Sequence, residues 1–225
     1  VLVALPRIDV EAWADWLGIG AEPAAPRAPG ASEGEVRIDH IALRTPELIL
    51  NNRSFRNVTL GATRNDAGGY DANVVSDGAA GYIGWRPGAK GSTGGAGLGL
   101  VSARLSKLHI ANNRKSDVVD VLRAPARRLP ALEVEVENFE LGDMKLGRLD
   151  VSAANVGTGN SAAWKVSRLD LVNPDMKLAA SGEWLPGATG ALRTQVRFAF
   201  DAKDAGAALG RFGMPDAVAS GHGKL

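Results

Sequence analysis

The chain has 225 residues, 45% of them hydrophobic, so it can bury an extensive apolar surface, and wholesale disorder is excluded. Its 26 Lys and Arg residues nearly balance its 25 Asp and Glu residues, which gives no indication of a nucleic-acid partner. The lack of cysteine excludes a disulfide framework and a thiolate metal site, and no apolar run approaches the ~20 residues that span a bilayer.

Residues 1–34 are expected to hold a strand, a short helix and a linker. Val1–Leu5 is predicted to be a strand that ends at Pro6, and Asp9 can cap a helix over Val10–Leu17. Ala21–Gly34 is rich in Ala, Pro and Gly and is typical of a linker. Because the chain opens on Val1-Leu2-Val3, within what we expect to be a strand, we expect it to be a piece of a longer polypeptide.

Residues 35–111 are predicted to form a first β-repeat unit, because the hydrophobic period changes to two. Pro46 is expected to end its first strand, and Asn51-Asn52 is a plausible hairpin turn. The strands expected are Glu35–Leu43, Leu48–Leu50, Phe55–Ala62, Tyr70–Val75, Ala79–Trp85 and Leu98–Ile110.

Residues 112–130 are polar and are predicted to be a connector. Five basic residues lie in it, which fits a solvated segment or, alternatively, contact with anionic lipid headgroups. They are Arg114, Lys115, Arg123, Arg127 and Arg128.

Residues 131–202 are predicted to form a second β-repeat unit with a cleaner alternation. Val134 and Val136 alternate with three glutamates, so one face of that strand is apolar and the other is charged. Residues 203–225 are expected to hold a second short helix, capped by Asp201 or Asp204, and the start of a further unit.

The two β-repeat units are related copies. A shift of 91 positions aligns Ile41–Ala62 with Leu132–Ala153 without a gap, and eight apolar positions then coincide. The sequence Trp85-Arg86-Pro87-Gly88 also recurs as Trp184-Leu185-Pro186-Gly187.

No catalytic, cofactor or metal motif is present. The glycine-spaced run Gly95–Gly99 has Leu100 where a dinucleotide fingerprint needs a glycine. His40, His109 and His222 lack ligand spacing. Three glutamates two residues apart on one strand would lie ~6.5–7 Å apart on a flat solvated surface, which is no catalytic pair. These are Glu133, Glu135 and Glu137. We expect neither an enzyme nor a cofactor.

The expected fold is mainly β, with roughly ten to twelve amphipathic strands and two short helices. Two short helices cannot cover a sheet about 45 Å wide, so its apolar face must be buried in another way. The sheet could close into a sandwich or barrel, or curl into an open groove that holds an apolar ligand such as acyl chains. We favour an extended, twisted antiparallel sheet forming an open groove. The predicted lining residues are Leu43, Val58, Leu60, Val134, Val136, Leu149, Val151, Met176, Leu178, Val196, Phe198 and Phe200.

Several segments are also similar to a known family. Leu129–Phe139, Leu146–Leu149, Pro174–Leu178, Ser181–Trp184 and the tail Asp204–Asp216 resemble the C-terminal part of the YhdP family, in the AsmA-like superfamily. The resemblance implies a protein of the Gram-negative envelope, anchored in the inner membrane through a part of the chain not present here. Its periplasmic groove of repeated β units would carry phospholipid toward the outer membrane.

The resemblance implies phospholipid as the main partner, with envelope proteins as possible further partners and no nucleic acid. The alternative function is a closed β-sandwich that acts as a structural or assembly module of the envelope without lipid transport.

Overall fold

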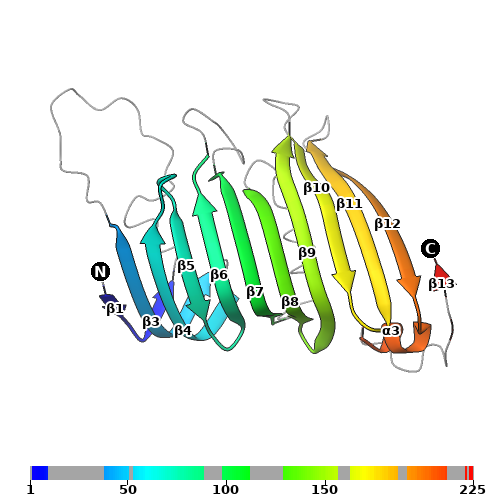
Figure 1. Ribbon diagram of the computed structural model, residues 1–225, viewed down its shortest axis with the longest axis horizontal. Helices are drawn as coiled ribbons and strands as arrows, with labels where there is room; N and C mark the ends of the chain where they lie inside the picture. The colour runs from blue at the N-terminus through cyan, green and yellow to red at the C-terminus, as the bar shows by residue number, and fades with distance from the viewer. Residues whose placement is uncertain are drawn as a thin grey trace.

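The computed structural model describes residues 2–9, 38–50, 53–88, 98–111, 129–156, 163–186, 192–211, 221 and 223–224. In these residues thirteen strands belong to one sheet, and one helix, α3 (Ala205–Arg211), follows β12 (Figure 1). The strands are β1 (Leu2–Ala4), β2 (Arg7–Asp9), β3 (His40–Leu50), β4 (Arg53–Arg64), β5 (Tyr70–Val75), β6 (Ala79–Arg86), β7 (Leu100–Ile110), β8 (Ala131–Leu141), β9 (Met144–Val156), β10 (Ala163–Val172), β11 (Met176–Pro186), β12 (Leu192–Ala202) and β13 (Gly223–Lys224).

The sheet is open, and its strands follow one another in chain order from β3 to β12. Neighbours from β3 to β7 are antiparallel, and so are neighbours from β8 to β12. The pair β7–β8 is parallel, and β1 and β2 both run parallel to β3. The described strands therefore form a mixed sheet in a single layer, and the two-layer sandwich considered as the alternative is not formed by this part of the chain.

The predicted strands are largely confirmed, and Tyr70–Val75 has the bounds that the sequence predicted. The prediction that Pro46 ends a strand is wrong, because β3 continues through Pro46 to Leu50. Beside Pro46 the neighbouring chain changes from β1, which pairs with β3 as far as Arg44, to β2, which pairs from Glu47 onward. Pro46 has no backbone N–H to donate, and it lies at a position where neither β1 nor β2 pairs with β3.

The buried hydroxyl of Thr45 supports the same passage. Thr45 Oγ1 accepts a hydrogen bond from the Glu47 N–H at 3.2 Å and donates one to the Glu47 carbonyl at 2.8 Å. A hydroxyl that is 1% exposed therefore has its partners, and the backbone after the proline is held in place.

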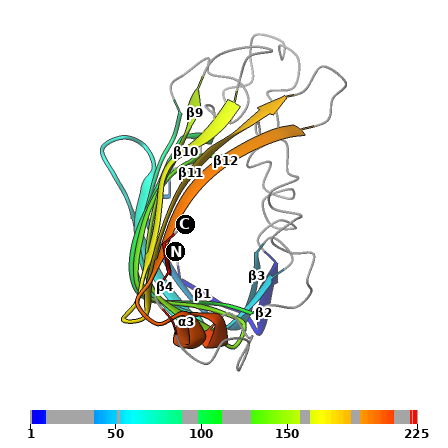
Figure 2. The same cartoon turned by 90° about the vertical axis from the view of Figure 1, so that its right-hand side faces the viewer.

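The strands bend near one end, so that the sheet is strongly curved in side view (Figure 2). The bend coincides with irregularities in the strands: register shifts occur in the β6–β7 and β8–β9 pairs. Asn57 on β4 has a φ of 54°, and Gly147 on β9 has a φ of 92°. A Cβ at Gly147 would lie 2.5 Å from the Val172 carbonyl oxygen, so this position requires glycine. β-bulges of this kind add local twist and bend a strand.

Helix α3 confirms one of the two predicted helices. Asp204 caps it, because its Oδ1 accepts a hydrogen bond from the Ala207 N–H at 3.0 Å. Arg211, at its other end, forms an ion pair with Asp175 in the turn between β10 and β11. The helix predicted over Val10–Leu17 and the basic residues of the connector lie outside the described residues. The division of the chain into repeat units and connectors stays a prediction.

Candidate functional site: an apolar groove

One face of the sheet is apolar from β3 to β12. Residues directly opposite each other on neighbouring strands share a face, so the register traces rows of side chains across the sheet. We call the following the central row: Leu43, Leu60, Val74, Gly81, Leu105, Val136, Leu149, Leu171, Leu178 and Phe200. The row crosses ten strands without a polar side chain, a distance of about 43 Å at ~4.8 Å per strand.

A second apolar row lies beside the central row, on the side away from the bend. It crosses the same ten strands, again without a polar side chain, and we call it the second row. Its members are Ile41, Ala62, Ala72, Ile83, Ala103, Val134, Val151, Leu169, Ala180 and Phe198.

The twelve residues that the sequence predicted for the groove all lie on this face. Nine of them belong to the two rows. Val58 is opposite Thr45, Met176 is opposite Ala202, and Val196 is opposite Gly182. Their contact with lipid stays a prediction.

The apolar face lies on the inside of the bend. Leu149, before the bend in β9, packs in one cluster with Leu146 and Met144, which lie beyond it. In the same way Phe55 packs against Val58 and its neighbours across the bend in β4. Apolar residues from both arms of a bent strand can meet only on its concave side, so the sheet is a groove with an apolar lining.

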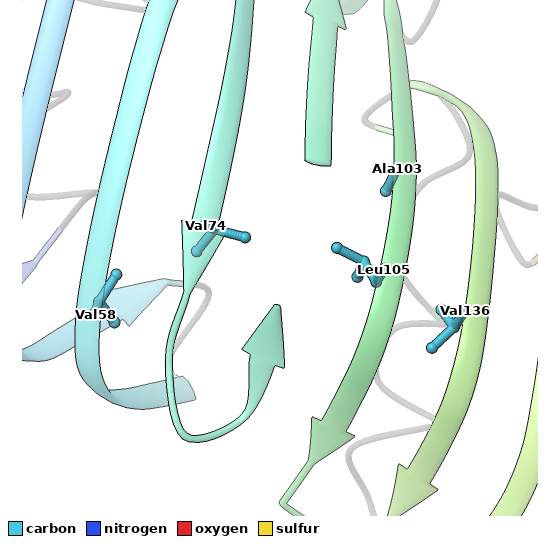
Figure 3. Packing of buried hydrophobic residues seen from close by; sticks show 5 residues of the cluster. All are labelled: Val58, Val74, Ala103, Leu105 and Val136. Carbon is cyan, nitrogen blue, oxygen red and sulfur yellow. The ribbon is translucent and has the colours of Figure 1, made fainter. Parts of the chain in front are cut away.

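Burial within the groove is uneven. Close to the bend the lining is closely packed: Val58, Val136 and Met176 are each 1% exposed. Figure 3 shows part of this packing, with side chains contributed by β4, β5, β7 and β8. On β12 Val196 is 52% exposed and Phe198 is 62% exposed. The groove therefore has a dry floor and, at its β12 end, an uncovered apolar wall.

The opposite face of the sheet is polar and charged. Arg168 Nη2 donates to Asp150 Oδ1 at 2.6 Å, in an ion pair across β9 and β10. A cavity of about 610 Å³ lies on this face, and Arg104 and Glu135 contribute to its wall. The two faces therefore differ sharply in chemistry.

A short hydrogen bond connects two groups of the polar face. Tyr82 donates its hydroxyl proton to Asp71 Oδ1 at 2.6 Å, and Asn65 donates to the same oxygen at 3.2 Å. The Tyr82 hydrogen bond, followed by that of Asn65, lowers the pKa of Asp71, and the same bond to Asp71 raises the pKa of Tyr82. The pair ties β5 to β6.

The described residues hold no cluster of metal-ligating side chains. No group of three or more His, Asp or Glu residues in the described ranges could hold a metal ion. His40 and His109 lie on β3 and β7, while His222 is outside the described residues. The three glutamates of β8 are exposed on the polar face. Among these residues no helix is long and apolar enough to cross a membrane.

Sequence reasoning missed several residues of the groove floor. Val74, Ala103 and Leu105 are buried in the cluster with Val58 and Val136, and Leu171 is buried in the cluster with Met176. The alternation of the sequence could have identified them. Val74 lies in a strand of alternating apolar and polar residues, and Ala103 and Leu105, two residues apart, must share a face of their strand.

A single open sheet, bent around one continuous apolar face, defines the class: an open-groove β protein whose lining suits hydrocarbon. The comparison with protein families agrees with this class. The whole chain, residues 1–225, matches the family described as YhdP protein, and the chain therefore belongs to the YhdP family. No curated protein and no solved structure matches it. Membership confirms the resemblance seen in the sequence and places the chain among the AsmA-like, bridge-like lipid-transport proteins, which are not an enzyme family.

Proposed function

We propose that this chain is a segment of a periplasm-spanning protein that carries phospholipid acyl chains between the inner and outer membranes. The observation that supports the proposal most directly is the central row, which lines the inside of the bend with apolar side chains over ten strands. A binding site for one small molecule would not need an apolar surface about 43 Å long.

The mechanism is passive movement of acyl chains along an apolar track. Each methylene that leaves water contributes ~0.8 kcal/mol, whichever apolar residues it contacts. Because this interaction has no directional requirement, a chain can shift from one strand to the next with little change in free energy. The headgroup remains in water outside the apolar lining.

The proposal includes a localisation and partners, which the resemblance to the family suggests. In it the segment lies in the periplasm and is attached to the inner membrane through another part of its parent protein. Phospholipid is its main partner, and other envelope proteins are possible partners.

The test is to look for lipid in the purified protein and at the lining. We expect phospholipid to be retained and detected by mass spectrometry, and a photoreactive residue placed at Val151 or Phe198 to cross-link to it. Val75 is the matched control, because it is 60% exposed and lies on the opposite face. A protein that is free of lipid, or one that cross-links equally from Val75, would contradict the proposal.

A further inference from the structure

The rim of the groove farthest from the bend carries side chains of a different kind. A third row of opposed residues runs along this rim from β4 to β12, and we call it the rim row. Its members are Arg64, Tyr70, Trp85, Val101, Leu132, Ala153, Val166, Gly182 and Val196. One step farther out on the same face, Trp164 and Trp184 lie opposite each other, with ring centroids 5.4 Å apart.

This rim gathers most of the large amphipathic aromatic residues that the structure describes. Tyr70, Trp85, Trp164 and Trp184 lie on it, whereas Tyr82 lies on the polar face. Such rings combine an apolar body with one polar atom, and they concentrate where an apolar region meets water. Among the described residues of the groove floor there is no Tyr or Trp.

Three of the four rim aromatics use their polar atom within the protein. Tyr70 donates its hydroxyl proton to the Ile38 carbonyl at 2.9 Å. The indole N–H groups of Trp85 and Trp164 donate to the carbonyls of Leu98 at 2.9 Å and Pro130 at 3.0 Å. Within the described part of the chain, the indole N–H of Trp184 has no hydrogen-bond partner.

A second donor without a partner lies on the same rim. Among the described residues two buried side-chain donors lack a hydrogen-bond partner, and they are Arg64 Nε and Trp184 Nε1. Arg64 is also the one charged residue among the described members of the central, second and rim rows. Buried donors normally have acceptors, so the position of both on one edge of an apolar groove calls for an external acceptor.

We propose that this rim is the headgroup side of the groove. Arg64 and Trp184 donate hydrogen bonds to the anionic and ester oxygens of an amphiphile, and its hydrocarbon chain points toward the bend. The inference rests on the proposed function and adds the orientation of the lipid and the residues that contact its headgroup. The acceptor must be an oxygen because both groups are donors, and Arg64 favours one that carries negative charge, such as a phosphate.

The two donors are not parts of one binding site. Arg64 is on β4 and Trp184 is on β11, seven strands away, which corresponds to about 34 Å. One lipid cannot touch both, so they mark two positions along a single track. A headgroup that follows the rim would meet a donor near each end of the described groove.

Orientation is tested by photo-cross-linking of the unmodified chain with two forms of a sixteen-carbon lysophosphatidic acid. One form carries a diazirine next to the phosphate, and the other carries it on the terminal carbon of the chain. We expect the headgroup probe to label peptides that contain Arg64 or Trp184, and the chain probe to label residues of the central row that keep exposed surface, such as Leu149 and Phe200. Identical or reversed labelling would overturn the orientation while leaving the proposed function standing. Labelling by neither probe would contradict the proposed function itself.

Contact with the headgroup is tested by affinity. Lysophosphatidic acid is compared with the monoacylglycerol of the same chain, which lacks only the phosphate. Arg64→Gln should weaken binding of lysophosphatidic acid about tenfold, the effect of losing one charge-assisted hydrogen bond, and leave binding of monoacylglycerol unchanged. Arg104→Gln is the matched control, because it removes an exposed arginine from the polar face and should affect neither lipid. An equal loss for both lipids in Arg64→Gln would show that the change is structural and would refute the headgroup contact.

Trp184→Phe provides an independent variant, since it removes the unpaired N–H and keeps an aromatic ring. We expect a severalfold loss of affinity for lysophosphatidic acid with unchanged thermal stability. The matched control is Tyr82→Phe on the polar face, in which an internal hydrogen bond is lost, so affinity for lysophosphatidic acid should not change. Unchanged affinity in Trp184→Phe would remove this residue from the headgroup contact.

Discussion

Phe198 offers the sharpest test of whether the apolar wall of the groove receives hydrocarbon. The ring lies on β12, opposite the small side chain of Ala180, and the residue is 62% exposed. Replacing Phe198 with Ser removes the ring from the wall and keeps the strand and its hydrogen bonds. We expect weaker binding of a long-chain amphiphile and only a modest loss of folding stability.

The size of the effect follows from the exposed area. A phenylalanine side chain presents ~200 Å², of which 62% is ~120 Å². If an acyl chain covers all of that area, the contribution is ~3 kcal/mol at ~25 cal/mol per Å², or roughly 100-fold in Kd. The ~80 Å² that the protein already covers limits the loss of folding free energy to ~2 kcal/mol.

Two measurements on the Phe198→Ser variant distinguish a loss of lipid binding from a loss of folding stability. The Kd for a fluorescent sixteen-carbon amphiphile reports the groove, and urea unfolding reports stability. Val75→Ser is the matched control, because Val75 has a similar exposure on the opposite face and its loss should leave the Kd unchanged. A Phe198→Ser variant with the parental Kd would refute the reasoning, and so would a loss of several kcal/mol in stability, because the ring would then be part of a closed core.

Three further changes test the groove floor, the bend and the polar face. Met176→Ala should cost ~2–5 kcal/mol in urea unfolding, because Met176 is 1% exposed, and a loss below ~1 kcal/mol would mean that its cluster is loosely packed. Gly147→Ala should cost more than ~1–2 kcal/mol, since it combines a positive φ with a Cβ 2.5 Å from a backbone oxygen. The matched control is Gly210→Ala within α3, where a Cβ would meet nothing within 4 Å, and it should stabilise by up to ~1 kcal/mol. Equal melting temperatures for the two variants would contradict this account of the bend. Tyr82→Phe should raise the pKa of Asp71 toward its ordinary value in an NMR titration, because it removes the main cause of the lowered pKa. In the parent protein the stabilisation linked to that lowered pKa is present above the ordinary pKa of an aspartate and is lost as the pH falls through the lowered value. The stability of the variant should therefore depend less on pH in this range. An unchanged pKa of Asp71 in the variant would refute the assignment.

The sequence was sufficient to place the predicted lining on one face, because alternation is a local property. Val134 and Val136 had to share a face whichever strand paired with theirs. The sequence also indicated the repeat, and the structure places aligned residues such as Leu60 and Val151 on the same face of the sheet. The predicted antiparallel sheet is a mixed one, because β7–β8 and the pairs of β1 and β2 with β3 are parallel; the direction of a pairing depends on a connection that leaves no periodic signal.

The bend was also hidden, although a trace of it is present in the spacing. Where a strand passes the bend, successive inward residues are three apart and not two, as in Phe55 and Val58 or Val136 and Phe139. Without the pairing, that spacing cannot be distinguished from the end of a strand, which is why the interruption at Pro46 was misinterpreted. The rim could not be predicted either. Arg64 and Trp184 lie on the same edge of the sheet only because of how each of the eight strands from β4 to β11 is aligned with the next.

The parallel step between β7 and β8 has a consequence for the length of the groove. Five antiparallel strands precede the step and five follow it, so both sets enter the sheet in the same direction and place their bends along the same border. Adding or removing one whole set of five strands would change the length of the groove by about 24 Å and leave the direction of every later strand unchanged. Loss of a single strand would reverse every later strand and move its bend to the opposite border. In such an architecture whole sets of five strands can extend or shorten the reach of the molecule while every set keeps its direction.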